Sequence, residues 1–170
     1  MKFLLIAATF IIMEPVAYLA HRLIMHGVGW ALHRSHHSVT LKKIEANDAY
    51  PVIFASATII AMAIGTSRGD LSFLLYVGIG VTAYGMVYTF IHDVYIHGRF
   101  FSVPKVGLLE KLKFDHQIHH LYGKEPFGML FPVVPKSVRA RALTVLATNR
   151  EMGFDELIPG WSAKGSYQEV

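Results

Sequence analysis

The sequence predicts an all-α integral membrane bundle of three to four transmembrane helices, with a histidine-rich cap for two metal ions on the cytoplasmic side. Three observations lead to this fold class. Of the 170 residues, 53% are hydrophobic and only 16% are charged, whereas an average soluble domain has about 25% charged residues. Several apolar runs are long enough to cross a bilayer, and the ten histidines gather in clusters just beyond two of them.

Three apolar runs are predicted to be transmembrane helices, at residues 3–20, 49–67 and 71–91. The first run is interrupted only by Glu14 and Pro15, and its length is close to the roughly 20 residues that cross a hydrocarbon core. Only the polar turn Arg68-Gly69-Asp70 separates the second run from the third, so we expect these two to form a helical hairpin. A backbone in lipid must satisfy its own hydrogen bonds, which favours helices over open strands.

The chain becomes polar and basic beyond His92. Two shorter apolar patches, at residues 127–135 and 142–147, are predicted to be interfacial or re-entrant, and a fourth span stays open as an alternative. The tail, residues 136–170, is expected to be basic and peripheral. Because no linker separates two cores, residues 1–170 are interpreted as one membrane-bound domain.

The charge pattern predicts the orientation in the membrane. Basic residues outnumber acidic ones by 16 to 12, but they form no stripe with stacking aromatics, so we expect no nucleic-acid partner. The positive-inside rule then places the two basic segments in the cytoplasm, and the amino terminus and the Arg68 turn outside. We expect a bacterial inner-membrane protein, with its basic residues at Arg22, Arg34, Lys42, Lys43, Arg99, Lys105, Lys111 and Lys113.

All ten histidines fall into four clusters, in the order HxxxxH, HxxHH, HxxxxH, HxxHH. Each HxxHH covers an arc of about 100° on a helix, which would aim three imidazoles at one spot. The two rings of an HxxxxH lie about 140° apart on an ideal helix. Either the helix end unwinds there, as Gly27 and Gly98 would permit, or the two rings serve different metals. The predicted ligands are His21, His26, His33, His36, His37, His92, His97, His116, His119 and His120.

So many imidazoles exceed the needs of one four- to six-coordinate ion, which implies two metals. The sequence has no cysteine, so thiolate sites and cysteine-ligated iron–sulfur clusters are excluded. Iron is favoured because a site beside the membrane suits oxygen chemistry on an apolar substrate, although zinc is a serious rival for nitrogen ligands. A metal-bound imidazole usually gives its other N–H to a carboxylate or carbonyl; the candidates for this supporting role are Glu14, Asp48, Asp93 and Asp115.

The four-motif order among apolar helices resembles the fatty acid hydroxylase and sterol desaturase superfamily, and within it the bacterial-type β-carotene 3-hydroxylases. The resemblance covers roughly residues 10–135. It rests on the stretch from His21 to His37, on Asn47-Asp48-Ala-Tyr50, on Tyr84-Gly85-Met-Val-Tyr88 before His92-Asp93, and on Gly123-Lys-Glu-Pro-Phe127-Gly128.

This resemblance implies two iron ions that use O₂ and external electrons to hydroxylate C3 of a β-ionone ring, taking β-carotene through β-cryptoxanthin to zeaxanthin. The carotenoid would enter from the membrane lipid. Aromatic residues expected to line the ring pocket are Trp30, Tyr84, Tyr88 and Phe127. Small residues on the third span, such as Gly78 and Gly80, would either leave room for the polyene or let helices approach closely, and the second role is favoured.

No haem site or dinucleotide fingerprint is visible, so electrons would come from a separate ferredoxin-type donor, with Lys105, Lys111 and Lys113 as its docking surface. Alternatives within the superfamily are a carotenoid ketolase and a fatty acid or sterol hydroxylase. Alternatives from another class are a non-redox zinc membrane protein and a metal transporter, although a transporter would be expected to place its histidines within the spans.

Overall fold

The computed structural model describes residues 1–37 and 44–151. Within these ranges the chain is helical and contains no strand, which confirms the all-α prediction. Its elements are α1 (Lys2–Leu19), η1 (Ala20–Val28), α2 (Trp30–His33), η2 (Ala46–Asp48), α3 (Ala49–Ser67), η3 (Gly69–Leu71), α4 (Phe73–Thr89), η4 (Phe90–Ile96), α5 (Gly107–Tyr122) and α6 (Lys136–Glu151).

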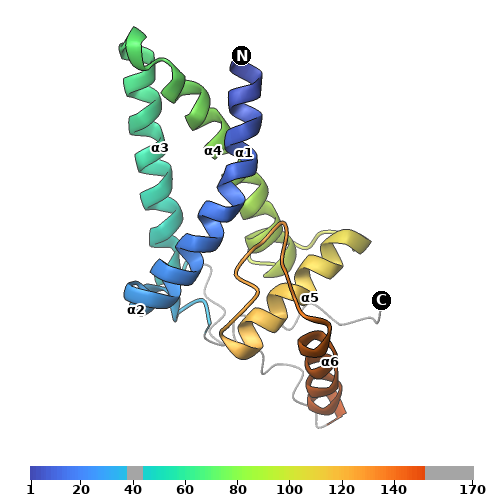
Figure 1. Cartoon of the computed structure of the whole chain (residues 1–170). Helices are drawn as coiled ribbons and strands as arrows, with labels where there is room; N and C mark the ends of the chain where they lie inside the picture. The colour runs from blue at the N-terminus through green and yellow to red at the C-terminus, as the bar shows by residue number, and fades with distance from the viewer. Residues whose placement is uncertain (38–43, 152–170) are drawn as a thin grey trace.

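Three helices are long and apolar enough to cross a membrane, at Lys2–Val28, Ala46–Ser67 and Phe73–Ile96. They agree with the three predicted runs, except that the third helix begins two residues later than predicted, at Phe73, and that the first and third helices continue past the runs as the π-helical segments η1 and η4. Helix α4 packs against both α1 and α3. The amino terminus and the turn between α3 and α4 lie at the same end of the bundle (Figure 1).

Small residues on α4 let the neighbouring helices approach closely. A Cβ atom at Gly80 would lie 2.7 Å from the Ile6 carbonyl oxygen of α1, and one at Gly78 would lie 2.2 Å from the Met62 side chain of α3. A Cβ at Gly85 would meet nothing within 4 Å. Helix packing, the favoured role for Gly78 and Gly80, is therefore confirmed at these two positions.

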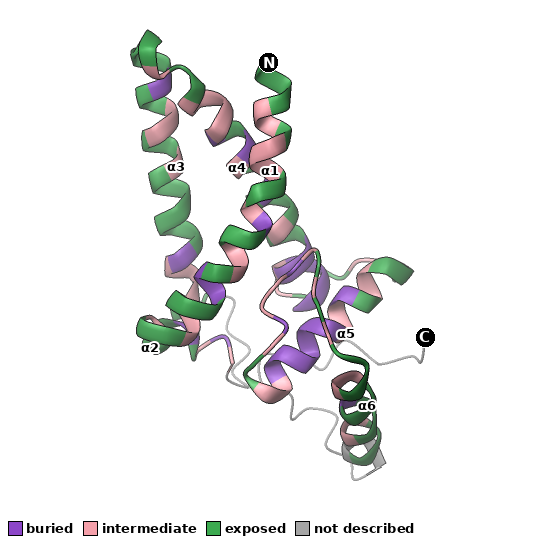
Figure 2. Cartoon of the chain, in the orientation of Figure 1, coloured by how far each residue is buried: buried purple, intermediate pink, exposed green. Residues whose placement is uncertain are grey.

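Burial is concentrated at the end of the bundle opposite the Arg68 turn. Figure 2 shows mainly exposed or half-buried residues on the upper parts of α1, α3 and α4, and buried residues gathered around η4 and α5. Apolar side chains that a water-soluble domain would bury are exposed on α3, including Ile59 at 65% and Ile60 at 61%. Such surfaces require an apolar solvent, which agrees with a membrane location. The buried core at the other end consists of Ile91, Tyr95, Ile96, Leu112 and Met129.

The carboxyl-terminal part of the described chain supplies no fourth span. Residues 127–135 form an irregular loop, and residues 142–147 lie inside α6, so neither patch crosses the bilayer. Helix α6 is held against α5 by an ion pair between Arg139 and the fully buried Asp115. The rest of the predicted peripheral tail, residues 152–170, and Lys42 and Lys43 of the first basic segment lie outside the described residues.

Candidate metal centre

The two HxxxxH pairs lie on π-helical segments, and this winding solves the geometric problem of their spacing. In a π-helix the N–H of residue i+5 bonds to the carbonyl of residue i; here the His97 N–H donates to the His92 carbonyl at 3.0 Å. The ring centroids are 4.7 Å apart for this pair and 5.1 Å apart for His21 and His26. The two rings of each pair thus lie on one face of their helix.

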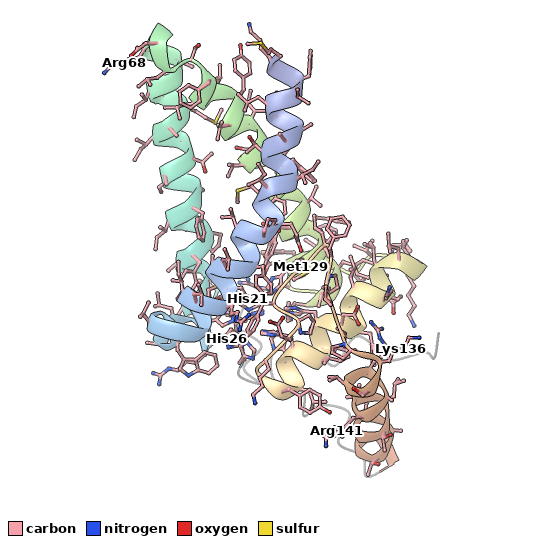
Figure 3. All side chains as sticks on the ribbon, in the orientation of Figure 1. His21, His26, Arg68, Met129, Lys136 and Arg141 are labelled. Atoms are coloured by element: carbon pink, nitrogen blue, oxygen red, sulfur yellow. The ribbon has the colours of Figure 1, made fainter. Side chains whose placement is uncertain are left out.

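Nine histidines form two groups, in each of which the candidate ligand atoms lie within 4.8 Å of one another. The five-histidine group is His21, His26, His33, His37 and His119, and the four-histidine group is His36, His92, His97 and His116. The tenth, His120, lies between them, with its ring 4.4 Å from that of His37 and its Nε2 2.9 Å from Nε2 of His116. All predicted ligands therefore converge at one end of the bundle, where Figure 3 labels His21 and His26.

Each HxxHH motif divides its rings between the two groups, contrary to the expectation that all three aim at one spot. In the first motif His33 ends α2 and the chain then turns, which sends His36 to the four-histidine group and His37 to the five-histidine group. In the second motif, on α5, His116 and His119 go to different groups. A separation of three or four residues leaves rings near each other but not parallel, so one motif can span two adjacent sites.

The hydrogen bonds of the Nδ1 atoms determine which ring nitrogens of the five-histidine group carry a proton. His21 Nδ1 lies 3.0 Å from the Phe127 carbonyl oxygen, and His119 Nδ1 lies 2.6 Å from the Lys124 carbonyl oxygen. Since carbonyl oxygens only accept, both Nδ1 atoms carry the proton and both Nε2 atoms carry a bare lone pair. His33 Nδ1 has the same relation to Asn47 Oδ1, at 2.7 Å, and its Nε2 lies 3.1 Å from that of His21. Two facing lone pairs repel unless a cation lies between them.

The four-histidine group repeats this pattern with carboxylates. His92 Nδ1 lies 3.3 Å from Asp93 Oδ1, and His36 Nδ1 lies 3.5 Å from Glu45 Oε2. The Nε2 atoms of these two histidines face each other at 3.1 Å. Metal–nitrogen bonds of about 2.1 Å place neighbouring ligand nitrogens roughly 3.0–3.4 Å apart. Both groups thus have the spacing and the lone-pair arrangement of a metal site, and the donor set fits a metal that accepts imidazole.

Burial favours the neutral form of six of the clustered imidazoles, and ligation requires that form. Desolvation holds the pKa of His36, His116, His119 and His120 well below the usual value of 6.5. The same cause lowers the pKa of His33 to about 4 and that of His37 to about 2. At neutral pH their ring nitrogens are therefore available to a metal without the loss of a proton.

Of the four predicted carboxylates, Asp93 is the one found beside a histidine. Its Oδ1 also accepts a bond from Arg99 Nη1 at 2.8 Å, and the same guanidinium forms a two-bond pair with Asp48 at 2.7 and 2.8 Å. Asp48 is therefore connected to Asp93, and through it to His92, by Arg99. Asp115 faces Arg139 of α6 rather than a ring nitrogen.

Glu14 has a different environment from the predicted one, because the acceptor for His21 is the Phe127 carbonyl. The Glu14 side chain is only 9% exposed. One of its oxygens accepts the N–H groups of Met129, Leu130 and Phe131, and the other accepts the Tyr84 hydroxyl at 2.6 Å. Glu14 thus binds the loop that carries the Phe127 carbonyl. Figure 3 shows this loop, labelled at Met129, beside the first helix.

Comparison with known sequences shows the family of the chain. The sequence model described as fatty acid hydroxylase matches residues 6–138. The chain belongs to this family. It is 40% identical over 134 residues to a protein named beta-carotene hydroxylase from Pantoea ananas, which covers 75% of each chain.

Further relatives extend the fatty acid hydroxylase family match to other bacteria and to plants. A protein of the same name from Pseudescherichia vulneris is 36% identical over 143 residues, covering 81% of this chain and 80% of that one. A chloroplastic beta-carotene 3-hydroxylase 1 from Arabidopsis thaliana is 33% identical over 123 residues, covering 69% of this chain but 40% of the longer plant protein. No solved structure matches the chain significantly.

The four aromatic residues predicted to line a substrate pocket lie at different distances from the histidines. The Phe127 ring is 5.0 Å from that of His26, and the half-exposed Trp30 ring is 5.2 Å from the same ring. Tyr88 stacks on His92 at 5.3 Å. Tyr84 of α4 is buried, donates its hydroxyl to Glu14 of α1, and has its ring 6.0 Å from that of Tyr88. Their role in binding substrate stays a prediction.

Several residues that support the centre carried little signal in the sequence. The carbonyls of Lys124 and Phe127 orient two histidines, but a backbone carbonyl is present at every position and cannot be singled out. Glu45 also carried little signal: it forms a reciprocal capping box with Asp48 at the start of η2, but Glu45-x-x-Asp48 differs from the Ser/Thr-x-x-Glu/Gln pattern by which that motif is found in a sequence. Arg99 could be found only through its partners, which lie 6 and 51 residues away.

Proposed function

We propose that this chain is a membrane-bound di-iron hydroxylase that uses O₂ to hydroxylate the β-ionone ring of a carotenoid. The observation that carries the proposal is the convergence of bare Nε2 lone pairs in two adjacent groups. Family membership and the named activity of the bacterial and plant relatives support a hydroxylating enzyme acting on carotene.

The proposed cofactor is a pair of iron ions, one in each histidine group. Bound there, the two ions would supply the O₂ chemistry that places one oxygen atom in a ring C–H bond, while external electrons and protons convert the other to water. The protein residues keep the imidazoles neutral, fix their Nδ1 protons on oxygen acceptors and exclude water by burial. The rival ion is zinc, which binds the same donors.

The proposed substrate is a long apolar molecule that enters from the bilayer. The three spanning helices have exposed apolar surfaces along much of their length, so a carotenoid dissolved in lipid would meet them directly. Phe127, Tyr88 and Trp30 surround the histidine rings with aromatic surface. We assign these three side chains to contacts with the ionone ring, and Tyr84 to positioning Tyr88 from behind.

The electron donor is proposed to be a separate ferredoxin-type protein. The exposed Lys105 and Lys111 and the half-buried Lys113 lie at or near the first half of α5, whose second half carries three of the histidines. A basic surface attracts an acidic partner by electrostatic steering. Reversing these three charges should lower donor-dependent turnover and its rate of association, with no loss of bound metal.

The proposed location is the inner membrane of a bacterium, with the histidine end facing the cytoplasm. Arg68 and the histidines lie at opposite ends of the bundle (Figure 3), and the basic residues of α5 share the histidine end, as the positive-inside rule requires. The chain has no natural cysteine, so single cysteines at Ser67 and Ser102 give a clean test. A membrane-impermeant maleimide applied to intact cells should label the first and spare the second.

One expression experiment tests the function. In cells that accumulate β-carotene, the chain should produce β-cryptoxanthin and zeaxanthin, detected by chromatography, and His36→Ala should abolish both. A keto-carotenoid product would instead favour the ketolase, and unchanged β-carotene with altered lipids would favour a fatty acid or sterol hydroxylase. Purified protein that is loaded anaerobically with ferrous iron should consume O₂ only when substrate and reductant are present. A non-redox zinc protein or a transporter would show no such uptake.

A further inference from the structure

Glu14 is a buried carboxylate whose hydrogen bonds all lead to one loop and one neighbouring helix. Its Oε1 accepts the backbone N–H groups of three consecutive residues, Met129, Leu130 and Phe131, at 2.9, 2.9 and 3.1 Å. Its Oε2 accepts the Tyr84 hydroxyl of α4 at 2.6 Å. Bonds from a carboxylate to backbone N–H groups are charge-assisted and stronger than neutral ones, so this side chain fixes the loop against the middle of the bundle.

The loop that Glu14 holds carries the acceptors of the five-histidine group. The Phe127 carbonyl, which binds His21 Nδ1, is two residues from the first anchored N–H, and the Lys124 carbonyl binds His119 Nδ1. Gly128 lies between Phe127 and the first of the three bonded N–H groups, and it packs closely on Glu14. A Cβ atom at this position would lie 3.1 Å from Glu14 Oε1. The loop therefore has little room to move while Glu14 is in place, and a shift of it would move both carbonyls.

The four-histidine group takes its outer support from other parts of the chain. His92 Nδ1 lies 3.3 Å from Asp93, which pairs with Arg99, and His36 Nδ1 lies 3.5 Å from Glu45. Among the described residues none of these groups is bonded to Glu14 or to the anchored loop. The two candidate sites therefore have separate hydrogen-bonded supports. Glu14 is connected to His92 through the Tyr84 hydroxyl and the ring contacts of Tyr84 with Tyr88 and of Tyr88 with His92. Because these ring contacts provide no acceptor for a His92 ring nitrogen, a change at Glu14 should leave the four-histidine group close to its wild-type affinity.

From these contacts we infer that Glu14 is a positioning residue for the five-histidine group, acting through the loop that carries the carbonyls of Lys124 and Phe127. The inference rests on the proposed di-metal function. Loss of the carboxylate frees three N–H groups, lets the loop shift and leaves the Nδ1 protons of His21 and His119 without fixed acceptors. Loss of such outer contacts typically weakens metal affinity about 10–100-fold.

The test measures metal binding by the purified full-length chain in detergent. Iron content is determined after anaerobic loading and exposure to graded chelator, and affinity is measured by cobalt(II) titration with absorbance as the readout. Wild type should hold two ions. Glu14→Ala should hold one ion as tightly as wild type and the other about 10–100-fold more weakly, and the retained ion reports that the protein is folded. Glu14→Gln, which keeps an acceptor oxygen for the three N–H groups, should recover most of the affinity.

Two controls identify which site is weakened. Glu110→Ala removes a carboxylate that also accepts a tyrosine hydroxyl at 2.6 Å, from Tyr95, but has no bond to the loop, and it should keep both ions. In the Glu14→Ala background, a further His116→Ala should remove the remaining ion, whereas a further His119→Ala should add little, because coupled sites are not additive.

The inference is overturned if Glu14→Ala and Glu14→Gln both hold two ions with wild-type affinity, or if Glu14→Gln weakens both sites to the same extent. A wild-type protein that binds fewer than two ions would instead refute the proposed function itself. The two failures are therefore distinguishable within one set of titrations.

Discussion

Replacing Arg99 with alanine should destabilise the protein far more than the deletion of an exposed, paired charge. The guanidinium makes two bonds to Asp48 and one to Asp93, at 2.7–2.8 Å, and its side chain is 9% exposed. It joins the start of the second span to the end of the third. Removing the guanidinium breaks these three bonds. It also leaves the two carboxylates close together without a cation to neutralise them.

The size of the effect follows from the burial of the partners. Removing one partner of a buried ion pair costs about 3–5 kcal/mol, and the lower end applies here because the Asp48 and Asp93 side chains are 28% and 15% exposed. A loss of about 3 kcal/mol corresponds to a fall in melting temperature of roughly 6–12 °C for a chain of this size. Arg99→Lys should recover part of it, because an ammonium group cannot make the two-bond pair with Asp48.

Thermal unfolding in detergent, followed by circular dichroism, measures this change. The chain offers a matched control in Arg68→Ala, because Arg68 forms a similar two-bond pair with Asp70 at 3.0 and 3.3 Å, with both side chains 63% exposed. Exposed pairs contribute about 0–1 kcal/mol, so the control should shift the melting temperature by less than about 4 °C. Equal shifts for the Arg99 and Arg68 variants would refute the interpretation that the Arg99 guanidinium stabilises the protein as a buried cation between Asp48 and Asp93.

Three further predictions concern the backbone and pH. Gly123 adopts φ 61° with no atom within 4 Å of an added Cβ, so Gly123→Ala should cost about 1 kcal/mol through backbone strain alone, seen as a lower melting temperature, with Gly123→Asn milder. Gly80→Ala should lower the melting temperature of the bundle because its Cβ would lie 2.7 Å from the Ile6 carbonyl oxygen, while Gly85→Ala should leave it unchanged; the reverse order would contradict the helix packing. In metal-stripped protein, burial lowers the pKa of His33 to about 4. Between about pH 6.5 and 4 this histidine is therefore protonated in the unfolded chain and neutral in the folded chain. The free energy of unfolding should therefore fall as the pH drops from about 6.5 towards 4, measured by denaturant titration, and a flat profile would contradict the burial of this ring.

Much of the fold could be predicted because lipid leaves so few choices to the backbone. The three apolar runs located the three spans, although the first and third helices extend 8 and 5 residues beyond them as η1 and η4, and the four histidine motifs identified every histidine ring that the structure brings together. Hydrophobic length and ligand chemistry are local properties of the sequence, and both signals were strong. The resemblance to the fatty acid hydroxylase family, which rested on these motifs, is confirmed by the family match.

The parts that could not be predicted depend on long-range contacts and on helix winding. An α-helical periodicity separates His21 from His26 by about 140°, and only the structure shows the π-helical winding that unites them. The partner of Glu14 lies 115–117 residues away and consists of backbone N–H groups, which leave no trace in the residue types. Similarly, the division of each HxxHH between two groups depends on how α2 and α5 are oriented toward each other.

The wide helical turns at the ends of the first and third spans also constrain how the length of this chain can change. A turn closed by an i→i+5 bond holds one residue more than an α-helical turn. Each HxxxxH motif therefore corresponds to an α-helical HxxxH motif with one inserted residue. Deleting one residue between His92 and His97 would let an ordinary helix stack the two rings as i and i+4. The same deletion would rotate everything that follows by about 100°, and α5 would then present its histidines away from their partners. Single-residue insertions and deletions should therefore be tolerated in the turn around Arg68 and excluded from the two motifs.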